Sequence, residues 1–207
     1  MRQHRVLLSI VAAAAAFPAP GHAQKQFEGH LTLTMNGDKG KPQPAEAWIK
    51  GRKMRMELGA EGQTFAMISD YEASRMTMIM PKMKMYMTQA LPKIDSLAQE
   101  ASSVTRTGRK DRVAGHRCEI VQITDKAGKR SEVCGATDMG SFAMGGGPGA
   151  RGKLPAWAAG MKAFFPLRVT DDTGAVVLDV TRIDAQRVSD DLFAPPVGYR
   201  TMSVPGR

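Results

Sequence analysis

Methionine occupies every second position in residues 76–80 of this sequence and again in residues 83–87. A period of two is the pattern of a β-strand with one apolar face, because successive side chains of a strand point to opposite sides. Pro81-Lys82 lies between the two stretches, and the phase of the alternation changes there. A turn at this point would reverse the chain, so we expect both strands to place their methionines on one face of an antiparallel sheet.

The same alternation extends over residues 27–87, which predicts a meander of antiparallel strands. Four-residue loops at residues 59–62 and 71–74, and a two-residue loop at Pro81-Lys82, would place Met56 opposite Phe65, Met67 opposite Met78, and Met78 opposite Met85. The opposite face is predicted to be mostly polar. In this register one apolar face contains Met54, Met56, Phe65, Met67, Met76, Met78, Met80, Met83, Met85 and Met87.

The remaining sequence predicts two short helices and further strands. Residues 91–102 and 154–165 carry apolar side chains at helical spacing, and we expect both helices to cover the sheet. A hairpin is expected around the turn-like residues 125–129, followed by closing strands at residues 167–170 and 176–183. The predicted fold class is therefore mainly β (α+β), with a single antiparallel sheet and short helices over one face.

Cys118 and Cys134 are the only cysteines, and the predicted hairpin brings them to neighbouring strands. We expect a disulfide, which closes a loop of about 15 residues and stabilises the fold by about 3 kcal/mol in the chain-entropy model. The rival interpretations, a redox pair or a metal site, are weaker, because the spacing is not C-x-x-C and no third cysteine is present.

The first 23 residues have the features of a secretory signal peptide. They begin with basic residues, continue through an apolar run at residues 6–17 and end at the small-x-small site Gly21-His-Ala23. The apolar run is shorter than the roughly 20 residues that span a bilayer. Removing 23 of 207 residues leaves 184, so we expect residues 24–207 to form a single periplasmic domain.

The net charge of the predicted exported chain is strongly positive. Loss of Arg2 and Arg5 lowers the formal charge from +9 to +7. Such a surface can meet the anionic headgroups of an envelope membrane, or serve only solubility. We expect no nucleic-acid partner, because export separates the protein from that substrate and the few aromatic residues do not alternate with basic ones.

Four further segments resemble a known family. They are Ala114-Gly-His-Arg-Cys118, Phe165-Pro-Leu-Arg-Val169, the strand at residues 178–183 and the ending Asp191-Leu-Phe-Ala-Pro-Pro-Val-Gly-Tyr199. Together with the methionine hairpin they resemble a family of uncharacterised exported bacterial proteins with a fold similar to that of the outer-membrane lipoprotein carriers. The resemblance implies a strongly curved half-barrel with short helices over a concave face that holds acyl chains. It implies no known activity, since the carriers' cargo-handling residues have no positional matches in this sequence.

The sequence offers little catalytic chemistry. His30 and His116 are the only histidines after the predicted signal peptide. Neither belongs to a pattern of nucleophile, base and carboxylate that sequence alone can assemble. We therefore expect a non-enzymatic protein with no catalytic residues, no cofactor and no metal site.

Three interpretations of the methionines remain open. Thioethers select Cu(I), but about three suffice for one ion. Methionine also fills ordinary protein cores, so the protein can be a structural or interaction module with a plain core. An apolar lining that repacks around varied ligands better explains so large a patch. We expect the ten residues of the apolar face to form a groove for an acyl chain, a lipid or a lipoprotein, with the two helices as a lid.

Overall fold

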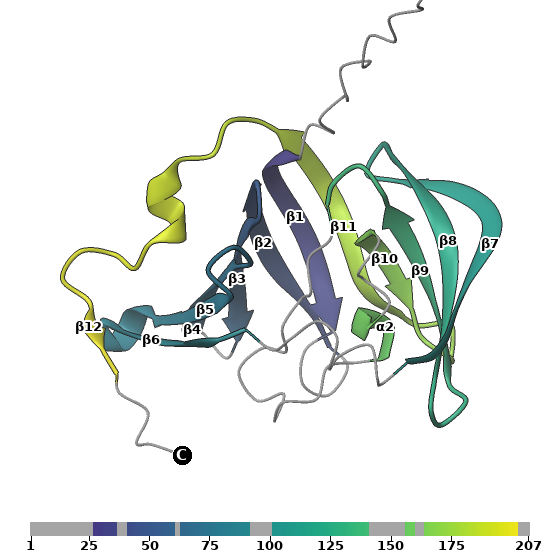
Figure 1. Ribbon diagram of the computed structural model, residues 1–207, viewed down its shortest axis with the longest axis horizontal. Coiled ribbons are helices and arrows are strands. Elements are labelled where there is room, and N and C mark those ends of the chain that lie inside the picture. Colours follow the sequence, from purple (N-terminus) through teal and green to yellow (C-terminus); the bar gives the residue numbers. More distant parts are fainter. Residues whose placement is uncertain are drawn as a thin grey trace, which may run out of the picture.

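The computed structural model describes residues 27–36, 41–60, 63–91, 101–140, 156–159 and 164–202 (Figure 1). The expected signal peptide, residues 1–23, lies outside these residues. No helix in the described part of the chain is both long enough and apolar enough to cross a membrane.

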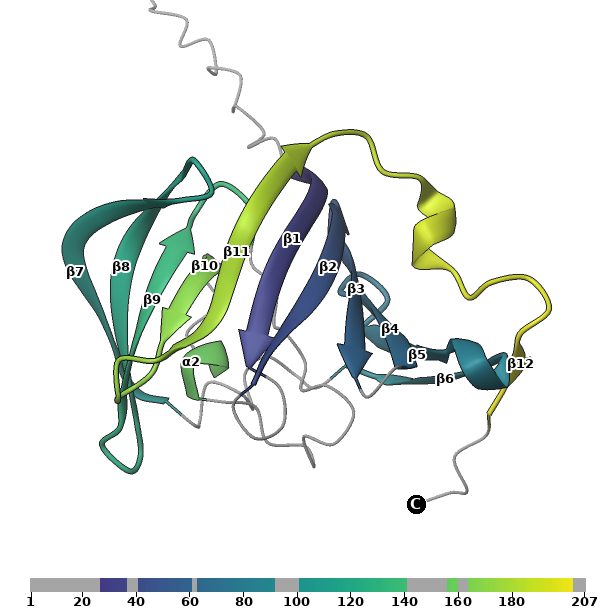
Figure 2. The ribbon, with the colours of Figure 1, turned by 180° about the vertical axis from the view of Figure 1, so that it is seen from behind.

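Within the described residues, twelve strands form one sheet in the order β12-β6-β5-β4-β3-β2-β1-β11-β10-β9-β8-β7 (Figures 1 and 2). Every neighbouring pair is antiparallel except β12 and β6, which run parallel. The strands are β1 (Glu28–Asn36), β2 (Pro42–Lys50), β3 (Lys53–Ala60), β4 (Gln63–Asp70), β5 (Arg75–Met80), β6 (Met85–Ala90), β7 (Ala101–Val113), β8 (His116–Asp125), β9 (Arg130–Ala136), β10 (Phe165–Thr170), β11 (Val176–Ala185) and β12 (Arg200–Thr201).

The described sheet is open, because its two edge strands, β7 and β12, do not pair with each other. It is also not strongly curled (Figures 1 and 2). The prediction of one mainly antiparallel sheet is confirmed, whereas the strongly curved half-barrel is not. Strand alternation specifies which side chains share a face, but it does not specify how far the sheet bends.

The described residues contain only parts of the two predicted helices. In the predicted helix at residues 91–102, residues 92–100 lie outside the described part, and Ala101 already begins β7. Within residues 154–165 only α2 (Ala156–Ala159) is helical among the described residues, and Phe165 begins β10. Phe165, Leu167 and Val169 alternate along β10 and are almost fully buried, so tertiary burial selects a strand there over a helix.

The main core lies against one face of the central strands. Leu31 and Leu33 of β1 are buried together with Leu178 and Val180 of β11, and Trp157 of α2 joins them. Gly135 of β9 permits a close approach to this core, since a Cβ atom there would lie 2.5 Å from the ring of Phe164. Tight packing at this point therefore requires a residue without a side chain.

The other face of β4 to β6 is covered by the end of the described chain. Phe193 and Tyr199 pack with Tyr86 against a small cluster of Ala66, Ile68 and Ile79. The sequence predicted a mostly polar surface here, and that prediction is wrong for this region. The sequence did indicate an apolar patch on this face, because Ile68 and Ile79 lie at the strand positions between those of the methionines.

Polar contacts attach this C-terminal segment to the sheet. Lys50 Nζ donates to Asp190 Oδ2 at 2.8 Å and to the carbonyl of Val188 at 3.1 Å. Arg55 Nη1 donates to the carbonyl of Leu192 at 2.9 Å. Leu192 lies in the short 3-10 helix η3 (Asp190–Phe193). We call residues 186–199, between β11 and β12, the strap. These contacts hold the strap across the outer face of β4 to β6, and Figure 1 shows it in yellow-green.

We expect Ala114→Asn to stabilise the fold. Val113 pairs with His116, so Ala114 and Gly115 form a two-residue turn, with φ of 50° and 78°. The left-handed region costs an alanine about 1 kcal/mol, and asparagine tolerates it better. Urea unfolding should therefore show a gain approaching about 1 kcal/mol. Ala90→Asn is the control, because Ala90 is an exposed strand residue without positive φ, and an equal gain there would contradict this explanation.

Candidate functional site

Four methionines form a continuous row across four neighbouring strands. Met56 lies opposite Met67, Met67 opposite Met78, and Met78 opposite Met87. We call these four residues the methionine row. Neighbouring strands are about 4.8 Å apart, so the row is about 14 Å long.

The structure corrects two of the three predicted turns. Ala60 pairs with Gln63, so this turn has two residues instead of four, and Met56 faces Met67 instead of Phe65. Met80 pairs with Met85, so a four-residue turn containing the 3-10 helix η2 (Pro81–Met83) replaces the predicted two-residue loop. The predicted pairing of Met67 with Met78 is confirmed. Both errors shift the register by two residues, so the predicted face is unchanged.

Burial of the methionine side chains decreases from the centre of the sheet towards the β6 edge. Met54 and Met56 are 1% and 2% exposed and belong to the main core. Met67, Met76 and Met80 are also buried, whereas Phe65, Met78, Met85 and Met87 are half-buried. Met83 lies in η2 and is 52% exposed. The ten predicted residues therefore include core positions at one end and partly open positions at the other.

A polar pair lies beside the row. Ser69 is fully buried between Met54 and Met76 on the neighbouring strands. Tyr71 lies just beyond β4, where burial raises the pKa of its phenol well above the usual value. A hydrogen bond with Ser69 and the charge of Arg52 lower that pKa by less. The phenol is protonated at neutral pH, as that of an ordinary tyrosine is, and has a hydrogen to donate. Sequence alternation could have identified Ser69, because it is the polar residue in the apolar phase of β4.

Three cavities lined by described residues lie away from the methionine row. One of about 220 Å³ separates β4 to β6 from the strap, between Ile68, Tyr86 and Phe193. The other two lie beside β7, with volumes of about 540 and 260 Å³. Their linings are rich in charged residues, which the sequence did not bring together.

The histidines have structural partners. His30 stacks on Trp48 with 4.9 Å between ring centroids, and its Nε2 contacts the carboxylate of Glu46. Its Nδ1 lies 3.8 Å from Asp184 Oδ2. His116 Nε2 lies 2.9 Å from Asp138 Oδ1. In the described ranges no three His, Cys, Asp or Glu side chains are grouped so that they could hold a metal ion.

Cys118 and Cys134 form the predicted disulfide, with their Cα atoms 5.3 Å apart. It links β8 to β9, and both residues are buried. A bond of this kind indicates an oxidising compartment, consistent with export.

Replacing both cysteines by alanine should lower the free energy of unfolding by about 3 kcal/mol, because the closed loop no longer restricts the unfolded chain. Chemical denaturation with and without a phosphine reductant measures this effect. The reductant should destabilise the native protein and leave the double variant unchanged. A loss below about 1 kcal/mol would show that the crosslink contributes little.

A family model described as "Domain of unknown function (DUF4412)" matches residues 27–199. No curated protein matches the chain. Among solved structures, an uncharacterized conserved protein from Thermus thermophilus is similar, with a TM-score of 0.53 and 13% identity over 86% of this chain and 91% of that chain. MucB in complex with MucA(peri) has a TM-score of 0.47 and 14% identity, over 88% of this chain and 59% of that chain. The first similarity shows a shared fold.

Proposed function

We propose that this chain, which belongs to the DUF4412 family, is an exported, non-enzymatic protein that binds an acyl chain along its methionine row. The ligand class is a fatty acid, a phospholipid or the acyl group of a lipoprotein. The observation that carries the proposal is the row itself, Met56, Met67, Met78 and Met87, with its inner end in the core and its outer end half-buried.

The length and flexibility of the row suit an extended hydrocarbon chain. About 14 Å of continuous thioether side chains can contact one acyl chain along most of its length. Methionine adapts to varied shapes because it is unbranched and has several rotatable bonds. A half-buried edge also gives a ligand a way to enter without opening the core. Export agrees with the disulfide between Cys118 and Cys134.

Ser69 and Tyr71 suit the polar end of such a ligand. Ser69 lies on the methionine side of β4 and Tyr71 lies just beyond that strand. The Tyr71 phenol, like that of an ordinary tyrosine, is protonated at neutral pH and can donate. A carboxylate or ester oxygen can accept from the half-buried Tyr71 hydroxyl group, whereas Ser69 is fully buried behind it. The favoured ligand is therefore an amphiphile with one polar end, in preference to a pure hydrocarbon.

Native mass spectrometry of the exported protein, compared with the denatured protein, gives a direct test. We expect an additional mass that matches a fatty acid or phospholipid and is lost on denaturation. A copper-sized increment would instead favour a Cu(I) site, and a bare chain that also fails to bind added oleate would favour a plain core.

Paired substitutions at the outer end of the row distinguish an acyl-chain ligand from a Cu(I) site. We expect Met78→Gln with Met87→Gln to weaken oleate binding at least about tenfold, because two apolar contacts become amides that must be desolvated. Met78→Leu with Met87→Leu should stay within about threefold, because leucine keeps the apolar area. Fluorescence displacement measures both.

Val176→Gln is the matched control, since Val176 is an exposed apolar residue on β11 and 46% of its surface is accessible. Its variant should bind oleate like the native chain. Equal weakening by the leucine and glutamine pairs, together with loss of Cu(I) binding in both, would contradict the acyl-chain proposal and support thioether ligation.

A further inference from the structure

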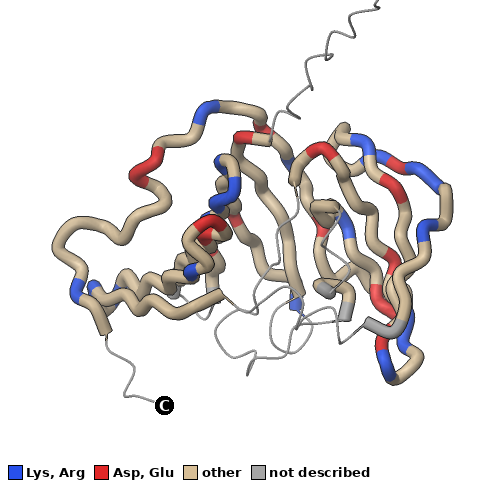
Figure 3. The backbone as a smooth tube through the Cα atoms, in the orientation of Figure 1, with Lys and Arg blue, Asp and Glu red and all other residues tan. Residues whose placement is uncertain are grey.

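β7 and β8 carry a concentration of positive charge at the edge of the sheet away from the methionine row. In the backbone trace of Figure 3, Lys and Arg positions are coloured blue along β7 and near the tip of the β8–β9 hairpin. A bulge interrupts the pairing of β7 with β8 between Arg106 and Lys110, and Gly108 within it has a φ of 73°. The extra residues of the bulge bend the strand and redirect its side chains.

The bulge separates paired from unpaired cations. Arg106 Nη1 lies 3.4 Å from Glu119 Oε2, and Arg109 Nη2 lies 2.5 Å from Glu132 Oε1. Lys110, Arg112 and Arg117 have no carboxylate partner in the part of the chain that the structure describes. Arg112 Nη1 instead donates to the carbonyl of Gly115 at 3.0 Å.

Two of these cations face each other directly. Arg112 pairs with Arg117 across the antiparallel ladder, and both side chains are exposed. Like charges at opposed positions of neighbouring strands destabilise a sheet. A negatively charged ligand between or beside the two guanidinium groups would therefore relieve their repulsion.

The same residues line a cavity of about 540 Å³, which we call the arginine cavity. Its lining comprises Lys110, Asp111, Arg112, Arg117, Cys118, Glu119, Gly135 and Thr137. Its two carboxylates offset part of this charge: Glu119 lies opposite Lys110 in the ladder and 3.4 Å from Arg106, and Asp111 Oδ1 accepts from the backbone N–H of Arg112 at 2.7 Å. The three cations of the lining still outnumber its two carboxylates.

The neighbouring cavity differs in its charge. It has a volume of about 260 Å³ and shares Lys110 and Asp111. Its two arginines are matched by carboxylates, because Arg109 pairs with Glu132 and Arg168 Nε donates to Asp179 Oδ1 at 2.7 Å. Of these two cavities, only the arginine cavity is lined by the facing pair Arg112 and Arg117.

We propose that the arginine cavity binds a phosphate ester, with the phosphate oxygens held by Arg112 and Arg117 and the remaining charge offset by Lys110. Guanidinium groups bind phosphate through paired N–H donors, which a single ammonium group cannot reproduce. The cavity volume lies within the range of small-molecule sites. It suits a glycerophosphate or sugar phosphate, either free in solution or as the headgroup of an anionic lipid.

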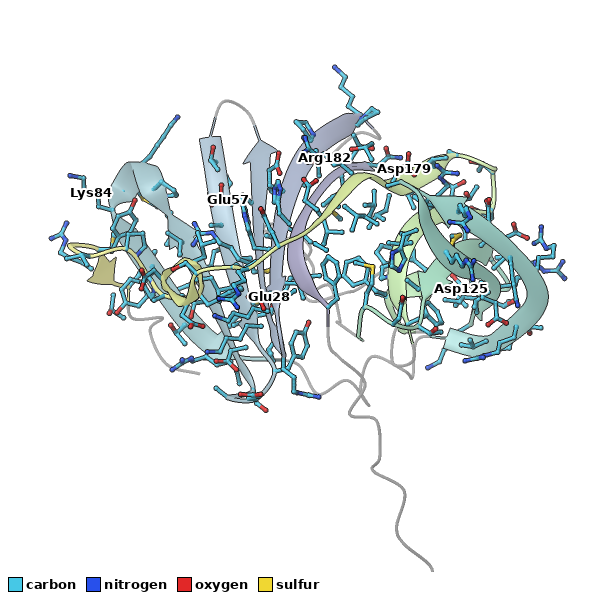
Figure 4. The ribbon with its side chains drawn as sticks, turned by 90° about the horizontal axis from the view of Figure 1, so that it is seen from above. Glu28, Glu57, Lys84, Asp125, Asp179 and Arg182 are labelled. Carbon is cyan, nitrogen blue, oxygen red and sulfur yellow. A yellow bond between two sulfur atoms is a disulfide. The ribbon has the colours of Figure 1, made fainter. Side chains whose placement is uncertain are left out.

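This site is independent of the acyl-chain proposal. β6, which ends the methionine row, and β7, which lines the arginine cavity, lie towards opposite edges of the sheet. Figure 4 shows the separation through two labelled residues, Lys84 beside β6 and Asp125 at the end of β8. Failure of one proposal therefore leaves the other standing.

Calorimetric titration with sn-glycerol 3-phosphate at about 0.15 M ionic strength, where the Debye length is about 8 Å, tests the proposal. We expect Arg112→Gln with Arg117→Gln to weaken binding at least about tenfold, and Arg112→Lys with Arg117→Lys to weaken it by an intermediate factor, because charge is kept but paired donation is lost. Thermal unfolding should show that both variants fold, since the native residues are exposed and removal of facing like charges relieves repulsion.

Arg187→Gln with Arg200→Gln is the matched control, because it removes the same charge at two exposed positions in the C-terminal segment. Its affinity should stay within about twofold of the native protein, because charges far from the cavity are screened. The proposal is overturned if the native chain does not bind glycerol 3-phosphate, if the control pair weakens binding equally, or if the dianion succinate binds as tightly as the phosphate ester.

Vesicles distinguish the source of the phosphate. Flotation with phosphatidylglycerol in phosphatidylcholine, compared with phosphatidylcholine alone, should depend on Arg112 and Arg117 if a lipid headgroup is the ligand. Binding of glycerol 3-phosphate without flotation supports a soluble phosphate ester in the same cavity. A third outcome overturns the site: the Arg112→Gln, Arg117→Gln variant and the Arg187→Gln, Arg200→Gln control reduce flotation equally, and glycerol 3-phosphate does not bind. This result would show only general attraction between the positive surface and the anionic vesicle.

Discussion

The antiparallel pairing of β1 with β11 is the interaction on which the rest of the structure depends. β1 lies between β2 and β11, so it joins the N-terminal meander of β1 to β6 to the later meander of β7 to β11. Leu31 and Leu33 are almost fully buried at this junction. Pairing segments about 150 residues apart costs loop-closure entropy, which their shared burial must exceed. A bulge between Thr32 and Leu33 adjusts the register, which places Leu33 opposite Val180.

The same junction explains how the outer face of β4 to β6 becomes covered. The chain leaves β11 beside β1, and Val188 N donates to Glu28 Oε1 at 2.8 Å. Lys50 and Arg55 then hold the strap as it crosses towards β6, where Arg200 N donates to the carbonyl of Lys84 at 2.9 Å. The strap also shields part of the β6 edge, since β12 pairs there over two residues. Exposed edges of this kind otherwise invite association between chains.

Two chemically different regions follow from this arrangement. Apolar, polarizable side chains concentrate at β3 to β6, and uncompensated cations concentrate at β7 and β8. Strand order separates them, with β1, β2, β11, β10 and β9 between them. The acyl chain and the phosphate ester that we propose as ligands would therefore not compete for the same residues. The disulfide ties β8 to β9 beside the arginine cavity, where Cys118 contributes to its lining.

The sequence by itself determined the strands and their faces. Alternation placed Met56, Met67 and Met78 on one side, and turn lengths wrong by two residues left that face unchanged because the side-chain period is two. It also determined the disulfide, because Cys118 and Cys134 flank a single hairpin. The facing of Arg112 and Arg117 is also local, because the two-residue turn Ala114-Gly115 sets it. The tertiary structure decided the extent of sheet curvature, the strand state of Phe165 and which segment covers Ile68 and Ile79. Local patterns do not settle these points, because each depends on which distant surface a segment is buried against.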